Sequence, residues 1–142
     1  MKSKAPLIAI ILIVSLQVYS QIDPDNIEII RDTYGVPHIH GTTDPEVAYG
    51  LAWAHAEDDF QTIQLTMLSG KGMLGHHLGK QGAAIDYVVK LLKCQETVAA
   101  EWPYLSDDYK QLIIAYTDGI NAYANSYPEK VLVKGSFPIT VE

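Results

Sequence analysis

The sequence predicts an α+β fold in which two short strands are followed mainly by helices. Apolar residues flank a polar centre between residues 27 and 40, as in a strand pair joined by a turn. Apolar residues then recur at helical spacing in two long stretches, about 45–68 and 107–126. The chain has 142 residues, 48% of them hydrophobic, which is enough for one modest core and one domain at most.

The first twenty residues have the pattern of a secretory signal peptide. Two lysines precede an apolar run from Ala5 to Val18, and Ser20 stands at the expected cleavage position. A run of about fourteen residues falls short of the roughly twenty that span a bilayer. We therefore expect residues 1–20 to direct export, to the periplasm or the medium, and to be removed. An uncleaved anchor is the alternative.

The charge balance argues against nucleic acid as a partner. The formal net charge is −7, and no stretch of the sequence clusters Lys and Arg as phosphate contacts require. A single cysteine, Cys94, excludes an intramolecular disulfide. Export is therefore inferred from the leader and not from cysteine usage.

Strands are predicted at Ile27–Arg31 and Val36–His40, joined by a turn at Tyr34-Gly35. Pro37 has no N–H to donate, so we place it at a strand start or on an edge.

A long helix is predicted over residues 45–68, ending near Gly70. Asp44 is the expected N-cap and Pro45 the first helical residue. Gly50 lies inside the helix at a cost of roughly 1 kcal/mol against alanine, so we expect it to mark a close contact. The face that packs inward is predicted to carry Ala48, Ala52, Ala56, Phe60, Ile63 and Met67.

Residues 70–82 are rich in glycine and are predicted to be a connector, followed by a short amphipathic stretch from Ile85 to Cys94. The sequence GKGMLG, residues 70–75, matches G-x-G-x-x-G literally. A dinucleotide fingerprint must follow a strand, whereas this motif follows a helix, so we reject that interpretation. The pair His76-His77 lies in the connector and receives no role.

The pair Trp102-Pro103 interrupts the pattern, and Ser106 is the predicted N-cap of a second long helix over residues 107–126. Pro128 stops this helix, and the tail after it is predicted to be strand-like or irregular. The repeating apolar positions are Leu112, Ile113, Tyr116, Ile120 and Tyr123.

Two groups of polar side chains are candidates for chemistry. His38 and His40 would share one face of a strand as a two-ligand metal clip, but no third ligand is visible, so a hydrogen-bonded structural role is favoured. His55 lies three and four residues before Asp58 and Asp59, which on one helix face could form an acid–base pair or half a metal site. Two structural roles are favoured over a catalytic or metal-binding role for the acidic residues Glu57, Asp58 and Asp59. They could form a solvated helix face, or one of them could be a buried carboxylate that ties the helix to the strand pair.

Nucleophiles are not apparent. No nucleophile-elbow motif surrounds any of the four serines after the leader, which are Ser69, Ser106, Ser126 and Ser136. Cys94 has no electropositive setting in the sequence. We therefore assign no catalytic, cofactor-binding or metal-ligating residue to this chain.

Several longer stretches together resemble the start of the penicillin acylase family of N-terminal nucleophile hydrolases, which includes acyl-homoserine lactone and aculeacin acylases. The stretches are RDTYGVPHIHG, DPEVAYGLAWAHAEDD, GKGMLGHHLG and LSDDYKQLIIAYTDGINAY. They occur between Ile27 and Tyr127 in the family's order and at its spacing. Two departures stand out: Asp59 replaces the arginine of the family's Gln-Asp-Arg, and the family position of His40 varies.

The resemblance implies a fragment of a four-layer αββα fold and a reaction. In this family an exported precursor cuts itself into two chains, and the serine that begins the second chain attacks an N-acyl amide, with its own α-amino group as base. Residues 21–142 would be the front of the first, α, chain of such a hydrolase of linear amide C–N bonds. The nucleophile, the oxyanion hole and the calcium ligands of the family would lie outside it.

The implied partners are the second, β, chain of the same precursor and a small N-acylated amide such as a penicillin, an N-acyl-homoserine lactone or a lipopeptide. Two alternatives of other classes remain. One is a small secreted binding module, or a truncated product, that keeps the front of the fold without the chemistry. The other is a metalloenzyme built on His38, His40 and the residues around His55.

Overall fold

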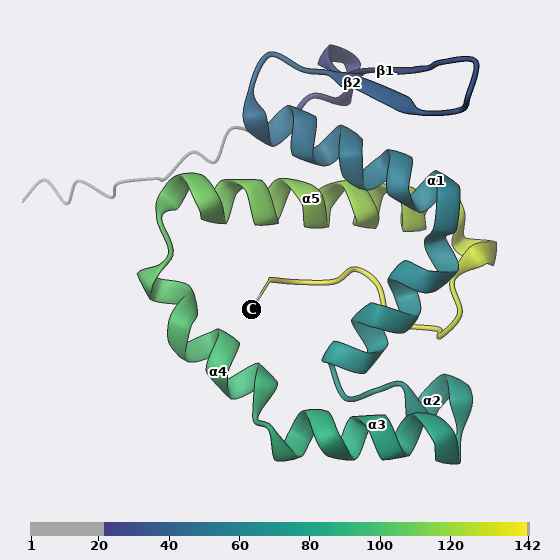
Figure 1. Ribbon diagram of the computed structural model, residues 1–142, viewed down its shortest axis with the longest axis vertical. Coiled ribbons are helices and arrows are strands. Elements are labelled where there is room, and N and C mark those ends of the chain that lie inside the picture. The colour runs from purple at the N-terminus through teal and green to yellow at the C-terminus, as the bar shows by residue number, and fades with distance from the viewer. Residues whose placement is uncertain (1–21, 142) are drawn as a thin grey trace, which may run out of the picture.

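The computed structural model describes residues 22–141 (Figure 1). The predicted leader, residues 1–20, lies outside the described residues. Two short strands and mainly helices follow one another, as predicted. In chain order they are η1 (Pro24–Asn26), β1 (Glu28–Arg31), β2 (Pro37–His40), α1 (Asp44–Gly70), α2 (Gly75–Leu78), α3 (Lys80–Leu91), α4 (Cys94–Glu101), η2 (Trp102–Tyr104), α5 (Asp107–Ser126) and η3 (Pro128–Lys130).

Strands β1 and β2 form the predicted antiparallel hairpin. The register places Ile29 opposite Ile39 and ends where Arg31 meets Pro37, so proline begins β2, as expected from its missing N–H. Gly35 has a φ of +84° in the connecting turn, a conformation that a side chain would strain. The described part of the sheet consists of these two strands.

Helix α1 begins with a capping box centred one residue earlier than predicted. Thr43, not Asp44, is the N-cap: its side chain accepts from the Glu46 N–H over 3.4 Å. The Glu46 carboxylate accepts in return from the N–H groups of Thr42 and Thr43 over 2.6 and 2.9 Å. Threonine's β-region backbone and the acid three residues later make it the better cap.

The same helix is bent, whereas a continuous helix over 45–68 was expected. Asp59 has a φ of −154° and a ψ of 69°, which are not helical values. Its carboxylate accepts from the Thr62 N–H over 3.0 Å and so caps the second half of α1 as a new helix. Figure 1 shows the change of direction, after which the helix runs toward α2.

Helices α1 and α5 pack on each other through small residues. A Cβ at Gly119 of α5 would lie 2.5 Å from the Tyr49 carbonyl oxygen, so the backbones approach closely there. Gly50 makes the close contact predicted for it, because its Cβ would lie 2.7 Å from Cγ2 of Ile39 in the hairpin. The core cluster consists of Ala52, Ala56, Phe60, Ile120, Tyr123 and Ala124.

The segment between the long helices is more helical than predicted. The connector contains α2, and α3 begins at Lys80 and not near Ile85. A further helix, α4, was not predicted at all. The Asp86 carboxylate accepts from the N–H groups of Leu74 and Gly75, both over 2.8 Å, and Gly82 lies against the backbone of these two residues. Glycines that serve close packing were therefore misread as loop residues.

Helix α5 agrees with the prediction: Ser106 caps it and Pro128 follows its end. The tail after η3 is irregular and contains no described strand. It crosses between α1 and α5 (Figure 1), held by two amides. Gln64, which is 1% exposed, accepts from the Leu132 N–H over 2.8 Å, and Asn121 accepts from the Ile139 N–H over 2.8 Å.

Candidate functional site

The most extensively bonded polar group joins the hairpin to α1. Arg31, at the end of β1, pairs with Glu57 over 3.1 Å and with Asp58 over 2.8 Å. Its other terminal nitrogen donates to the Gly35 carbonyl oxygen over 2.9 Å. Hydrogen bonds to Asp58 and then to Glu57 raise the pKa of Arg31. The charged guanidinium therefore connects strand, turn and helix.

This arrangement answers one question that the acidic run left open. A carboxylate does tie the helix to the strand pair, but it is not buried, because the Glu57 and Asp58 side chains keep 39% and 54% of their exposure. Glu57 also accepts from the indole N–H of Trp53 over 3.0 Å. Trp53 packs edge-on against Tyr123 of α5 with ring centroids 5.3 Å apart. The junction thus reaches the core between the long helices.

His38, in β2, lies beside the hairpin turn. Its Nε2 lies 3.5 Å from Asp32 Oδ2, and the other oxygen of Asp32 accepts from the N–H groups of Tyr34 and Val36 over 2.8 and 2.9 Å. The bond from Val36 is the main cause of a lowered pKa at Asp32. His38 and His40 are both exposed on one face of β2, as the strand period predicted.

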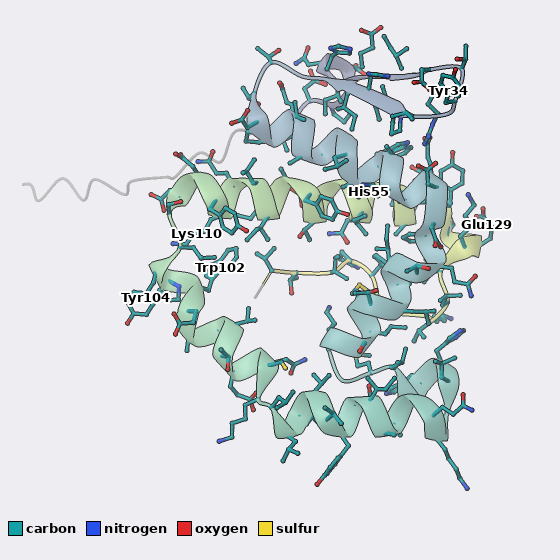
Figure 2. All side chains as sticks on the ribbon, in the orientation of Figure 1. Tyr34, His55, Trp102, Tyr104, Lys110 and Glu129 are labelled. Carbon is teal, nitrogen blue, oxygen red and sulfur yellow. The ribbon has the colours of Figure 1, made fainter. Side chains whose placement is uncertain are left out.

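His55 does not form the acid–base group considered for it. Its Nδ1 lies 3.0 Å from the Tyr116 hydroxyl, where α1 passes α5 (Figure 2). Asp58 is paired with Arg31, and the bend at Asp59 removes the i,i+4 relation to His55. The hydrogen bond of Asp59 to Thr62 lowers the pKa of its carboxyl. These acids support structure and do not form a pair with the histidine.

Several carboxylates in residues 22–141 accept hydrogen bonds from the backbone. Within residues 22–141, no group of three or more His, Cys, Asp or Glu side chains is placed to hold a metal ion. A clip at His38 and His40 therefore finds no third donor there. Asp32, Glu46 and Asp86 already accept backbone N–H groups. These three carboxylates therefore already hold backbone groups of the fold.

The backbone N–H groups at the end of the glycine motif, residues 70–75, donate to a carboxylate of the same chain. In a dinucleotide fingerprint, the backbone N–H groups where the helix begins receive a phosphate. Here the N–H groups of Leu74 and Gly75 receive the Asp86 carboxylate, and the motif follows α1 instead of a strand. The geometry thus agrees with rejecting a nucleotide site at this motif.

Serines within the described residues serve the backbone or the surface. Ser106 caps α5, and the Ser136 hydroxyl donates to the Val133 carbonyl oxygen over 2.8 Å. Ser69 and Ser126 lie in the last turns of α1 and α5. No hydrogen bond joins a serine to a histidine in residues 22–141. Cys94 is a half-buried free thiol at the start of α4.

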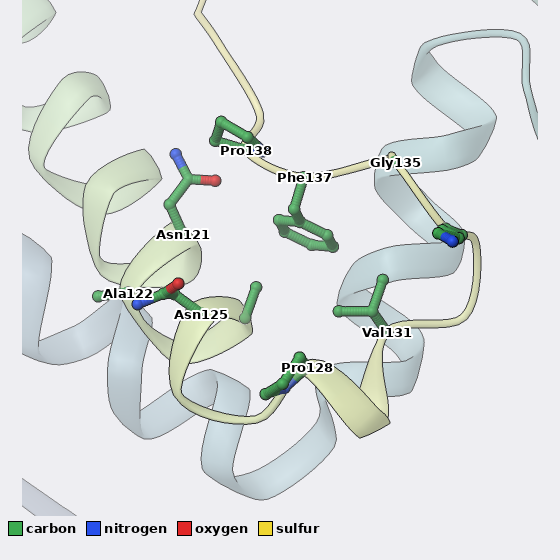
Figure 3. Close-up of a pocket in the computed structure, with 10 residues that line it drawn as sticks. Asn121, Ala122, Asn125, Pro128, Val131, Gly135, Phe137 and Pro138 are labelled. Atoms are coloured by element: carbon green, nitrogen blue, oxygen red, sulfur yellow. The ribbon is translucent and has the colours of Figure 1, made fainter.

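A pocket of about 630 Å3 opens between α5 and the tail (Figure 3). Its walls are largely apolar, with Phe137, Val131 and Pro128 around it. Asn121 lies at its edge, but both ends of its amide already bond to the Ile139 backbone. Lys134 also lines it. Its lining contains no His, Cys, Asp, Glu or Ser side chain.

Comparison with known proteins decides the family. Residues 26–141 match the family model described as penicillin amidase. The chain belongs to the penicillin amidase family. It is 28% identical over 123 residues to a penicillin G acylase of Escherichia coli, and 24% identical over 106 residues to an acyl-homoserine lactone acylase of Pseudomonas putida. These matches cover 84% and 75% of this chain but only 14% and 13% of the relatives.

A solved structure agrees with the assignment to the penicillin amidase family. The thermostable penicillin G acylase of Alcaligenes faecalis superposes with a TM-score of 0.62 at 26% identity, covering 81% of this chain and 66% of that chain. The predicted fold class, two strands and mainly helices as a fragment of an α+β acylase fold, is confirmed. A penicillin acylase of Pseudomonas sp., 27% identical over 100 residues, is named a proenzyme.

Three structural residues of this penicillin amidase family member were missed by sequence reasoning. Arg31 was placed in the polar centre of the hairpin without partners, and neither Asp86 nor Gln64 was singled out. A signal existed for Gln64, because it is a polar residue four positions after Phe60 on the apolar face of a helix. Asp86 carried no local signal, since its partners lie eleven and twelve residues earlier.

Proposed function

We propose that this chain is part of an exported amide hydrolase of the penicillin acylase type, which cleaves N-acyl amide bonds. The match of residues 26–141 to the penicillin amidase family carries the proposal. Relatives named as acylases of penicillin G and of acyl-homoserine lactones support an N-acyl amide as the substrate class. The first twenty residues support export.

The proposed role of this chain is that of a scaffold. The serine nucleophile, its α-amino base and the oxyanion hole would come from a second chain of the same precursor. Support comes from the relatives' length, since this chain spans about a seventh of the penicillin G acylase. The proenzyme name of another relative also supports a processed precursor. Any calcium ion of the assembly would bind outside residues 22–141.

The hairpin is the proposed contact with the second chain. Each strand bonds to the other along one edge, and within the described residues the outer edges carry no further strand. Ile30 and Val36 are 48% and 52% exposed on the hairpin. Edge strands with free backbone groups and apolar side chains are the usual means of extending a sheet. Arg31 and Gly50 would fix the angle at which the hairpin meets α1.

Expression of this chain alone and together with the continuation of its reading frame tests the proposal. Penicillin G, an N-acyl-homoserine lactone and an N-acylated peptide are the substrates, and release of the free amine is measured. We expect no turnover with this chain alone and turnover with the longer product. Turnover by the purified chain would contradict the scaffold role. A stop codon directly after Glu142, with no second chain encoded, would support the binding module instead.

A further inference from the structure

Helix α3 presents an apolar face to solvent. We define the α3 face as Ile85, Tyr87, Val88, Leu91 and Leu92, whose exposed fractions run from 45% for Ile85 to 67% for Tyr87. Spacings of three, four and seven residues place these side chains on one side of the helix. The other side of the helix packs inward, because Gly82 and Asp86 contact the backbone of Leu74 and Gly75. Within residues 22–141, the α3 face is thus exposed.

The charge of this region is opposite to that of the whole chain. Between residues 70 and 94 the sequence holds four lysines and one acid, in a chain with a formal net charge of −7. The lysines are Lys71, Lys80, Lys90 and Lys93. The acid is Asp86, whose carboxylate is used by two backbone N–H groups. None of the four lysines forms an ion pair within residues 22–141.

Spacing in the sequence hid this arrangement, since the lysines are separated by three to ten residues and no stretch clusters them. Folding brings α2 and α3 together at the end of the molecule opposite the hairpin (Figure 1). Acidic side chains such as Glu28, Asp32 and Glu46 lie on the hairpin and at the start of α1. The molecule therefore has a basic, apolar end and an acidic end along its long axis.

We propose that the α3 face and its lysines dock on an anionic lipid surface. A helix with large aliphatic residues on one side and lysines beside them is the pattern of a helix that lies in the membrane interface. Lysines near such a surface are attracted to anionic headgroups, and a tyrosine ring suits the boundary between chains and headgroups. No helix in residues 22–141 is long and apolar enough to cross a bilayer, so the contact is peripheral.

Charge favours this occupant over an uncharged apolar partner. An uncharged groove would cover the aliphatic side chains but leave four lysines without counter-charges, whereas anionic headgroups around inserted side chains provide both contacts together. The acidic end of the molecule would be repelled by the same surface, which orients the chain with α3 toward the lipid. A protein partner with an acidic rim is the competing occupant, and the experiment separates the two.

Vesicle flotation of the 142-residue chain tests the proposal. The vesicles are phosphatidylcholine alone or equimolar phosphatidylcholine and phosphatidylglycerol, at low and high salt. We expect at least roughly tenfold tighter binding to the anionic vesicles, falling as salt rises. Every variant keeps residues 1–21, so a difference in vesicle binding between an α3 variant and the unchanged chain comes from the α3 substitution. Circular dichroism checks that each variant keeps its helix content.

The double variant Leu91→Ser with Leu92→Ser should weaken binding to anionic vesicles roughly tenfold or more, because it removes inserted apolar area. Lys90→Gln with Lys93→Gln should remove most of the preference for phosphatidylglycerol. Tyr34→Ser is the matched control, since Tyr34 is 91% exposed at the opposite, hairpin end. This control should bind as the unchanged chain does.

Equal binding to both kinds of vesicle, or no effect of the leucine pair, would overturn the proposal. So would much stronger protection of the α3 amides from hydrogen exchange in the lipid-free longer product than in the 142-residue chain, because a protein surface would then cover the face. The flotation assay involves no amide hydrolysis. Its outcome is therefore independent of whether the proposed acylase activity is found.

Discussion

Replacement of Gly119 by alanine tests whether the close passage of α1 and α5 holds the scaffold together. The new Cβ would lie 2.5 Å from the Tyr49 carbonyl oxygen and 2.8 Å from the Ala52 Cβ. Neither atom can rotate away, since one belongs to the backbone and the other is fixed to it. The helices must separate by about 1 Å to restore ordinary van der Waals contact.

Two opposing effects set the magnitude. Alanine is a better helix former than glycine by about 1 kcal/mol. Overpacking a well-filled contact costs about 1–3 kcal/mol, and backbone obstacles place Gly119 at the upper end. The expected net loss is about 2 kcal/mol in the free energy of unfolding. For a domain of this size that lowers the Tm by roughly 5–10 °C.

Urea unfolding followed by circular dichroism and by tryptophan fluorescence measures this loss. Gly70→Ala is the matched control, because its Cβ would meet nothing within 4 Å at the end of α1. The control should be unchanged or gain up to about 1 kcal/mol. A Gly119→Ala variant as stable as the unchanged chain would refute the close-packing argument. Equal losses in both variants would refute it as well, since they would point to a general cost of removing glycine.

Three further variants probe the tail, the turn and the hairpin. Gln64→Leu leaves the part-buried Leu132 N–H without a partner and should cost about 2–4 kcal/mol in the free energy of unfolding, measured in urea. Gln61→Leu, at an exposed position three residues earlier, is the control and should show no loss. The lowered pKa of Asp32 means that its support of the turn is complete above the ordinary value of about 3.9 and is lost as pH falls through the folded value. The protection of turn amides, measured as the exchange rate relative to the intrinsic rate at each pH, should then fall, and Asp32→Asn should abolish this pH dependence. Gly50→Ala should reduce hydrogen-exchange protection of the hairpin while α5 stays protected; equal loss in both would show that the substitution acts globally.

Local sequence signals predicted the elements whose causes are local. The hairpin follows from β-branched residues around a glycine turn, and α5 follows from its serine cap and its apolar period. The bend at Asp59 was missed because an Asp within a helical pattern is read as solvated surface. Only the structure shows that its carboxylate caps a new helix.

The middle of the chain was predicted least well, for a physical reason. Glycines in residues 70–82 have two uses that a single sequence does not separate, namely turns with positive φ and close packing inside helices. Gly72 and Gly79 serve the first use, and Gly82 serves the second. The distinction depends on Asp86, eleven residues from its nearer partner.

The sequence by itself determined the family, the order of strands and helices, and the lack of an apparent nucleophile motif, because these rest on residues read in order and on local periodicity. Tertiary structure alone decided the partners of the polar side chains: Arg31 with two carboxylates of α1, His55 with Tyr116, Asp86 with the start of α2. It also showed that the α3 face is exposed within residues 22–141. Each of these depends on groups that meet only after folding, so no local pattern could assign them.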